Sequence, residues 1–119
     1  MPVDKGGDRD DSAVIPYAAI PFSVIRRVAK VCIEGEKRYG VDNWKKGLSY
    51  RSTFNHLMEH LVKYIAGDTS EDQLAKVMWG IMALMYYDDH RSLRVQFDDL
   101  HPKRKRDKTT PPPTPRVRP

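Results

Sequence analysis

Three stretches of this sequence repeat apolar residues at the spacing of an α-helix, and they constrain the fold more than any other feature. They cover residues 23–40, about 52–66 and about 70–88. Gly40 and Gly67 follow the first two stretches, at positions where glycine commonly ends a helix. The sequence therefore predicts an all-α fold, a small bundle of three to four helices.

Each stretch supplies apolar side chains for a shared core. These are Val24, Ile25, Val28, Val31 and Cys32 in the first stretch, Phe54, Leu57, Met58, Leu61, Val62 and Ile65 in the second, and Leu74, Val77, Met78, Ile81, Met82 and Met85 in the third. The third stretch is apolar nearly all round, which predicts that it lies at the centre of the bundle or at a subunit contact. We expect Ser23 to cap the first helix, and Ser70 with Gln73 to form a capping box on the third.

The length of the chain limits what it can build alone. A chain of 119 residues buries one modest core, so a large active site would need residues from another subunit. The single cysteine, Cys32, excludes an intramolecular disulfide and a cysteine-rich zinc site. The longest apolar run has eleven residues from Val77, which is too short to cross a bilayer, and the charged N-terminus does not resemble a signal peptide. We expect a soluble protein of a reducing compartment, with no membrane partner.

Composition divides the chain into a helical domain, residues 13–100, between two arms. Residues 1–12 and 101–119 are too polar, charged or proline-rich to repay the entropy of ordering, so we expect both to be disordered. The C-terminal arm holds seven Lys and Arg residues and one Asp, which leaves the first 100 residues nearly neutral. A basic tail of this kind predicts weak, salt-dependent contact with nucleic acid, while the domain itself shows no basic excess. Residues 16–20 read as an extended lead-in packed on the bundle, and residues 94–99 allow a short strand.

Metal-dependent phosphate chemistry needs carboxylates that converge on one ion. Six acidic residues are candidates for it: Glu34, Glu36, Glu59, Asp68, Glu71 and Asp72. Glu34 interrupts the apolar run near the end of the first helix, where the helix dipole disfavours acids. Its neighbour Gly35 would let a ligand or another backbone come close. Glu71 and Asp72 lie at the start of the third helix, and two interpretations stay open for them: metal ligands, or capping residues favoured by the dipole.

Two basic clusters are also candidate site residues. His56 and His60 lie one helical turn apart, a spacing that can bind zinc, but no third ligand is in view, so a structural or phosphate-contacting pair is favoured. Lys45 and Lys46 follow Trp44 in a short loop. The loop is either solvated or forms a lid that reaches phosphates, with Trp44 stacked on a base or on the bundle.

The loop and the helices around it carry a distinctive pattern. It consists of Arg38, Tyr39, Gly40, Asn43, Trp44 and Gly47 in the loop, His56 and His60 in the next helix, and Gly67, Asp68, Glu71 and Asp72 before the third helix. Over about residues 16–88 this pattern resembles the small all-α domain of bacteriophage dATP/dGTP diphosphohydrolases, which is similar to MazG-like nucleotide pyrophosphohydrolases.

The resemblance implies a homo-oligomer, a dimer or higher, in the cytoplasm of a bacterial host cell. It implies that a purine nucleotide is held near the subunit contact and is hydrolysed, with Mg²⁺ or Mn²⁺, to monophosphate and pyrophosphate. The implied nucleotide-binding residues are Tyr39, Asn43, Trp44, Lys45, His56, His60, Gln73 and Lys76. The implied catalytic and metal-binding residues are Glu34, Glu71 and Asp72.

Several positions depart from the pattern of that family. They are Pro16 and Ala18 in place of an Arg and an Asp, Glu59 in place of an Arg, and Gln73, Lys76 and Gly80 in place of two His and an Asn. Two interpretations follow: a hydrolase that tolerates these changes, or a protein that binds a nucleotide without cleaving it and so sequesters a host signalling nucleotide. A structural helical oligomer, or a nucleic-acid binder acting through its tail, remains an alternative.

Overall fold

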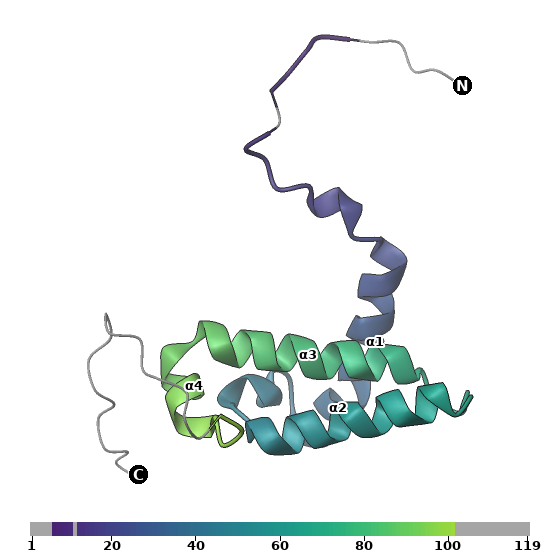
Figure 1. Ribbon diagram of the computed structural model, residues 1–119, viewed down its shortest axis with the longest axis vertical. Coiled ribbons are helices and arrows are strands. Elements are labelled where there is room, and N and C mark those ends of the chain that lie inside the picture. Colours follow the sequence, from purple (N-terminus) through teal and green to yellow (C-terminus); the bar gives the residue numbers. More distant parts are fainter. Residues whose placement is uncertain (1–5, 11, 102–119) are drawn as a thin grey trace.

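The computed structural model describes residues 6–10 and 12–101, and every regular element in those ranges is helical (Figure 1). The α-helices are α1 (Phe22–Tyr39), α2 (Tyr50–Ile65), α3 (Gln73–Asp89) and α4 (Arg91–Phe97), with short 3-10 turns η1 (Tyr17–Ala19) and η2 (Asn43–Lys46). The predicted all-α bundle is confirmed. The predicted basic tail lies almost wholly outside the described residues. No helix among the described residues is long and apolar enough to cross a membrane.

Helices α2 and α3 lie side by side, and α1 crosses them with its N-terminal half projecting beyond the pair (Figure 1). Gly80 on α3 explains how closely α2 and α3 approach. A Cβ atom at Gly80 would lie 2.7 Å from the Cβ of Leu57, which is buried in the contact. Glycine at this position therefore permits the α2–α3 packing that forms the centre of the fold.

A cluster of buried residues lies where the C-terminal half of α3 meets the start of α2. Tyr50, Ala83 and Tyr87 are fully buried there. Half-buried apolar and aromatic side chains surround them: Trp44, Trp79, Leu84, Tyr86, Leu93, Phe97 and Leu100. The core is thus built mainly from aromatic rings, and the loop that carries Trp44 is part of it.

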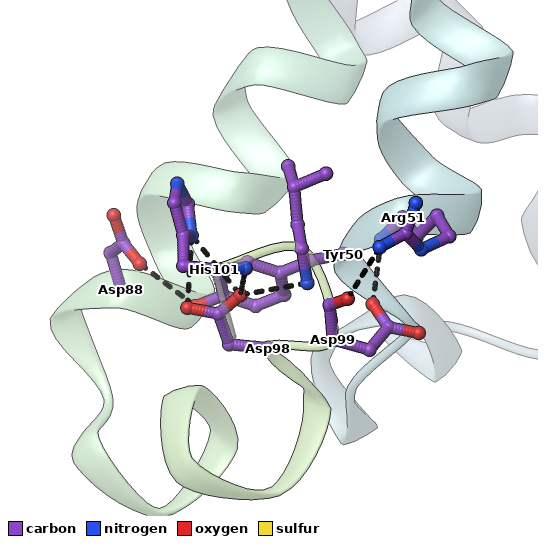
Figure 2. A network of polar contacts seen from close by, with 7 residues as sticks. Tyr50, Arg51, Asp88, Asp98, Asp99 and His101 are labelled. Atoms are coloured by element: carbon purple, nitrogen blue, oxygen red, sulfur yellow. Dashed lines mark hydrogen bonds and ion pairs between the residues drawn. The ribbon is translucent and has the colours of Figure 1, made fainter. Parts of the chain in front are cut away.

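Hydrogen bonds join the segment after α4 to the start of α2 (Figure 2). The carboxylate of Asp99 accepts hydrogen bonds from the Ser49 hydroxyl at 2.6 Å and from the Arg51 backbone N–H at 2.8 Å. The Arg51 guanidinium donates to the Asp99 carbonyl oxygen at 3.1 Å, and the Tyr50 hydroxyl donates to Asp88 at 2.8 Å. Asp99 thus adds an anion at the positive end of α2, and the hydrogen bond from Ser49 lowers the pKa of its carboxyl group.

The structure differs from the predictions at two helix starts and in one predicted strand. Helix α1 is preceded by Pro21 rather than capped by Ser23, since the fixed φ of proline suits the entry to a helix. The capping box on α3 is wrong, because Ser70 bonds Asp68 in a turn and Asp72 caps the helix through the N–H of Ala75. The possible strand over residues 94–99 falls in α4 and the residues just after it.

Many of the apolar side chains predicted to form the core are exposed to solvent. On α2 the side chain of Leu57 is buried, whereas Phe54, Met58, Val62 and Ile65 are 38%, 37%, 55% and 76% exposed. Met78, Ile81 and Met85 on α3 and Ile25 on α1 are also exposed. The lead-in does not pack as expected, since residues 17–19 form a 3-10 turn and Tyr17 is exposed. The chain therefore leaves uncovered apolar faces on three helices.

Candidate functional site

A half-open cavity of about 540 Å³, which we call the polar cavity, lies between helices α1, α2 and α3. Its wall consists of Lys30, Val31, Glu34, Leu48, Ser49, Ser52, Thr53, His56, Leu57, His60, Lys76, Trp79 and Gly80. Two lysines, two histidines and one carboxylate thus face a single space. This size is within the range of small-molecule sites, and the charged groups suit an anionic ligand.

A second cavity of about 410 Å³, the aromatic cavity, lies between the end of α1 and η2. Its wall consists of Val31, Cys32, Gly35, Glu36, Tyr39, Gly40, Asn43, Trp44, Leu48 and Trp79. Val31, Leu48 and Trp79 line both cavities, so the two spaces adjoin along a common apolar wall. One end of the combined site is aromatic and the other is cationic.

Trp44 is held in the wall of the aromatic cavity by the core rather than by the loop alone. Its ring packs edge-on against Tyr86 and Trp79, with ring centroids 5.1 Å and 5.8 Å apart. Its carbonyl oxygen accepts a hydrogen bond of 2.6 Å from the hydroxyl of Tyr87. The Nζ atom of Lys45 lies 5.8 Å from the Trp44 ring centroid, within range of a cation–π contact. Trp44 therefore packs on the bundle, as one interpretation of the loop expected, and it also lines a cavity where a base could stack.

Both histidines of the polar cavity are anchored through the same ring nitrogen. Nδ1 of His56 lies 2.8 Å from the Ser52 carbonyl oxygen, and Nδ1 of His60 lies 2.8 Å from Oε1 of Gln73. Because both partner atoms are oxygens that only accept, each Nδ1 carries a proton. In the neutral ring Nε2 is then an acceptor, and it becomes a donor to an anionic ligand when the ring is protonated.

Both carboxylate oxygens of Asp72 bind groups of the protein itself. The Arg27 guanidinium donates to both of its oxygens, at 2.7 Å and 2.8 Å, and this hydrogen bonding lowers the pKa of Asp72 from 3.8 to about 2. Asp72 also accepts from the N–H of Ala75 as the N-cap of α3. Of its two open interpretations, the capping role is confirmed.

Glu71 is paired with Lys76, whose Nζ atom donates to Oε1. This hydrogen bond is the main cause of the lowered pKa of Glu71. The second oxygen, Oε2, lies 4.0 Å from Nδ1 of His60, beyond hydrogen-bond range. Glu71 therefore neutralises Lys76 at the edge of the polar cavity and does not line it.

The three predicted metal ligands are not gathered in one place. Within residues 6–10 and 12–101, no three His, Cys, Asp or Glu side chains are close enough to share an ion. Glu34 lies in the polar cavity, while Asp72 and Glu71 are bound by cationic side chains. The Mg²⁺ or Mn²⁺ site stays a prediction, and this arrangement of one chain does not fit it.

The structure divides the other predicted residues between the two cavities. Tyr39, Asn43 and Trp44 line the aromatic cavity, whereas Glu34, His56, His60 and Lys76 line the polar cavity. Lys45 and Gln73 line neither, although Gln73 is buried and holds His60.

Other wall residues were not predicted as site residues, and they include Lys30, Ser49, Ser52, Thr53 and Trp79. Glu36 was predicted only as one of six acidic candidates. Lys30 lies one helical turn before Glu34, and this spacing was the available signal. No sequence signal placed Trp79 on the common wall, because that position depends on how α1 packs against α3.

Comparison with known families adds one finding. A family model described as dATP/dGTP diphosphohydrolase, N-terminal, matches residues 4–99. No curated protein and no solved structure matches the chain significantly. The matched residues include both cavities and every wall residue named above.

Proposed function

This chain belongs to the dATP/dGTP diphosphohydrolase N-terminal family, a family of nucleotide hydrolases, and from this premise we propose that it binds a purine nucleotide across its two adjoining cavities. The base occupies the aromatic cavity and the phosphates occupy the polar cavity. The observation that carries the proposal is the wall of Val31, Leu48 and Trp79, which joins an aromatic space directly to a cationic one. A nucleotide has the same division into an apolar ring system and an anionic chain.

At the base end, aromatic surface is available from Trp44 and Trp79, and Tyr39 stands exposed at the edge of the cavity. Stacking on aromatic side chains is a common way to hold a base. The indole N–H of Trp79 is buried and has no acceptor within the described residues. A small rotation of this ring would let it donate to a ligand oxygen at the junction of the two cavities.

At the phosphate end, Lys30 supplies positive charge, and Lys76 shares its charge with Glu71. Nε2 of His56 and His60 can donate to a phosphate oxygen when the ring is protonated, because Nδ1 is already directed at a protein oxygen. Lys30 makes no ion pair within the described part of the chain, so its charge is available to a ligand. Charge-assisted hydrogen bonds of this kind favour phosphate oxygens.

The arrangement favours binding over turnover. Two of the three carboxylates that metal-dependent hydrolysis would need are bound to Arg27 and Lys76. A nucleotide held by lysines and histidines would be retained intact, which is the behaviour of a sequestering protein.

Hydrolysis to monophosphate and pyrophosphate is the second candidate, and Glu34 favours it. This carboxylate lines the polar cavity and forms no ion pair or side-chain hydrogen bond within the described residues. In that position it could take the proton of a water molecule that attacks the α-phosphorus and displaces pyrophosphate.

The test mixes the full chain with purine nucleoside triphosphates and cyclic purine nucleotides, with and without Mg²⁺ or Mn²⁺, and follows them by chromatography. Nucleotide that is depleted from solution and recovered intact after denaturation supports the binding protein. Monophosphate and pyrophosphate released over many turnovers would establish the hydrolase instead. Lys30→Ala with Lys76→Ala should weaken binding at least about tenfold, whereas Lys37→Ala, a charge outside both cavities, should not. Failure of every nucleotide to bind would reject the proposal.

The proposal includes self-association, because a large apolar groove lies between α1 and α3. The groove, about 710 Å³, is lined by Ile20, Val24, Ile25, Val28, Ala29, Cys32, Met78, Ile81, Met82, Met85, Tyr86 and Asp89. Exposed apolar patches of this kind mark interaction sites. A second copy would cover it, and Met85→Lys should then shift the protein toward monomer in sedimentation experiments. A wild-type monomer at all concentrations would contradict this part of the proposal.

A further inference from the structure

Among the described residues, Glu36 is the one charged side chain in the wall of the aromatic cavity, and its position is unfavourable for the free protein. It lies in the last turn of α1, where the partial negative charge of the helix end repels a carboxylate. The residues one turn away, Cys32, Ile33, Tyr39 and Gly40, offer it no basic partner. Its side chain forms no ion pair within the described residues.

Glu34, on the same helix, differs from Glu36 in its neighbours. Lys30 precedes it by four residues and Arg38 follows it by four, so basic side chains flank it on the helix surface. Glu34 also faces the polar cavity, whereas Glu36 faces the aromatic one. The acid without basic neighbours is therefore the one beside the proposed base site.

Gly35 leaves space next to this carboxylate. A Cβ atom at Gly35 would meet no atom within 4 Å, although the residue lies inside α1 and lines the aromatic cavity. Glycine inside a helix costs stability relative to alanine, and no packing contact with another described residue explains why glycine stands here. An open helix surface beside Glu36 would let a flat ring approach the backbone.

We propose that Glu36 selects a guanine base in the aromatic cavity, an inference that rests on the proposed nucleotide binding. An ionised carboxylate only accepts hydrogen bonds, and its two oxygens match the N1–H and the 2-amino group on one edge of guanine. Adenine presents a lone pair at N1 on that edge and has no 2-amino group, so the carboxylate repels it. Asn43, half-buried in the same wall, carries an amide that can donate to guanine O6.

The experiment measures the dissociation constants of the full chain for dGTP, dITP and dATP by calorimetry. We expect dGTP to bind at least about tenfold more tightly than dATP, with dITP between them because it keeps N1–H and lacks the 2-amino group. Glu36→Gln and Glu36→Ala should weaken dGTP about tenfold and leave dATP unchanged or slightly tighter. Glu59→Gln removes the same charge from an exposed position outside both cavities and should preserve the preference.

The outcomes separate this inference from the proposal on which it rests. Preference for dATP, or a dGTP-to-dATP ratio that survives both Glu36 substitutions, would overturn the role of Glu36 while leaving nucleotide binding intact. Absence of binding by all three nucleotides would overturn both. Circular dichroism of each variant confirms that it is folded, as expected for an exposed position.

Discussion

The hydroxyl of Tyr87 donates a hydrogen bond of 2.6 Å to the carbonyl oxygen of Trp44, across 43 positions of sequence. Tyr87 is fully buried in α3, and burial raises the pKa of its hydroxyl to about 12. Because Trp44 belongs to η2, this contact joins the core to the loop that forms one wall of the aromatic cavity. The geometry of the candidate base site therefore depends on the packing of α3.

Tyr87→Phe should lower the free energy of unfolding by about 0.5–1.5 kcal/mol, because the Trp44 carbonyl oxygen loses one of its two donors and keeps the N–H of Gly47. Nucleotide affinity should fall with it, since the wall of the aromatic cavity is held less firmly. Urea denaturation and calorimetry measure the two effects. Tyr64→Phe, at an exposed position, is the control, and equal stability of the two variants would show that the hydrogen bond contributes nothing.

The Arg27–Asp72 pair should give the fold a weak dependence on acid. The pKa of Asp72 is about 2 in the folded chain against an ordinary value of 3.8, so the stabilisation is complete above about pH 4 and is lost as the pH falls through 2. Both side chains are exposed to solvent, which limits the effect to less than about 1 kcal/mol. Asp72→Asn keeps a good helix cap and should flatten this part of the curve of stability against pH. Identical curves for variant and wild type from pH 5 to 2 would contradict the assignment.

Gly35→Ala should separate stability from binding. In the part of the chain that the structure describes, a methyl group there meets no packed neighbour, so α1 gains about 0.5–1 kcal/mol from the better helix former. The same methyl group stands at the wall of the aromatic cavity and should weaken nucleotide binding severalfold. Thermal denaturation and calorimetry on one preparation check both signs. A variant that is more stable and binds unchanged would place the ligand away from Gly35.

Gly80→Ala should have the opposite effect on stability. Its Cβ atom would lie 2.7 Å from the Cβ of Leu57, so α2 and α3 would have to separate, at a cost of about 1–3 kcal/mol. The polar cavity is lined by both residues and should change shape as well. Gly80→Ala with Leu57→Ala tests the cause, because removing the Leu57 side chain beyond Cβ should not relieve a clash with Cβ itself. Stability equal to wild type for Gly80→Ala would show that the helices adjust without strain.

Local patterns predicted the helices well because they depend on neighbours in the sequence. The 3.6-residue period and the glycines at 40 and 67 placed α1, α2 and α3 within a few residues of their observed bounds. The Asp72 cap and the Arg27–Asp72 ion pair were harder to predict. The choice between capping and metal binding for Asp72 depends on Arg27, which lies 45 positions away in the sequence. The apolar stripe of α2 correctly marked a helix but overstated its burial, because most of that face is uncovered in one chain.

The sequence alone determined the class of fold, the family and the set of residue types available for phosphate and base recognition, since these follow from spacing and composition. The tertiary structure decided which of those residues meet. It placed Lys30 with His60 and Lys76 in one cavity. It also paired Asp72 with Arg27, so that this carboxylate does not face the cavity as a metal ligand. Such groupings arise from the packing of helices that are distant in sequence, and no local pattern specifies how α1 crosses α3.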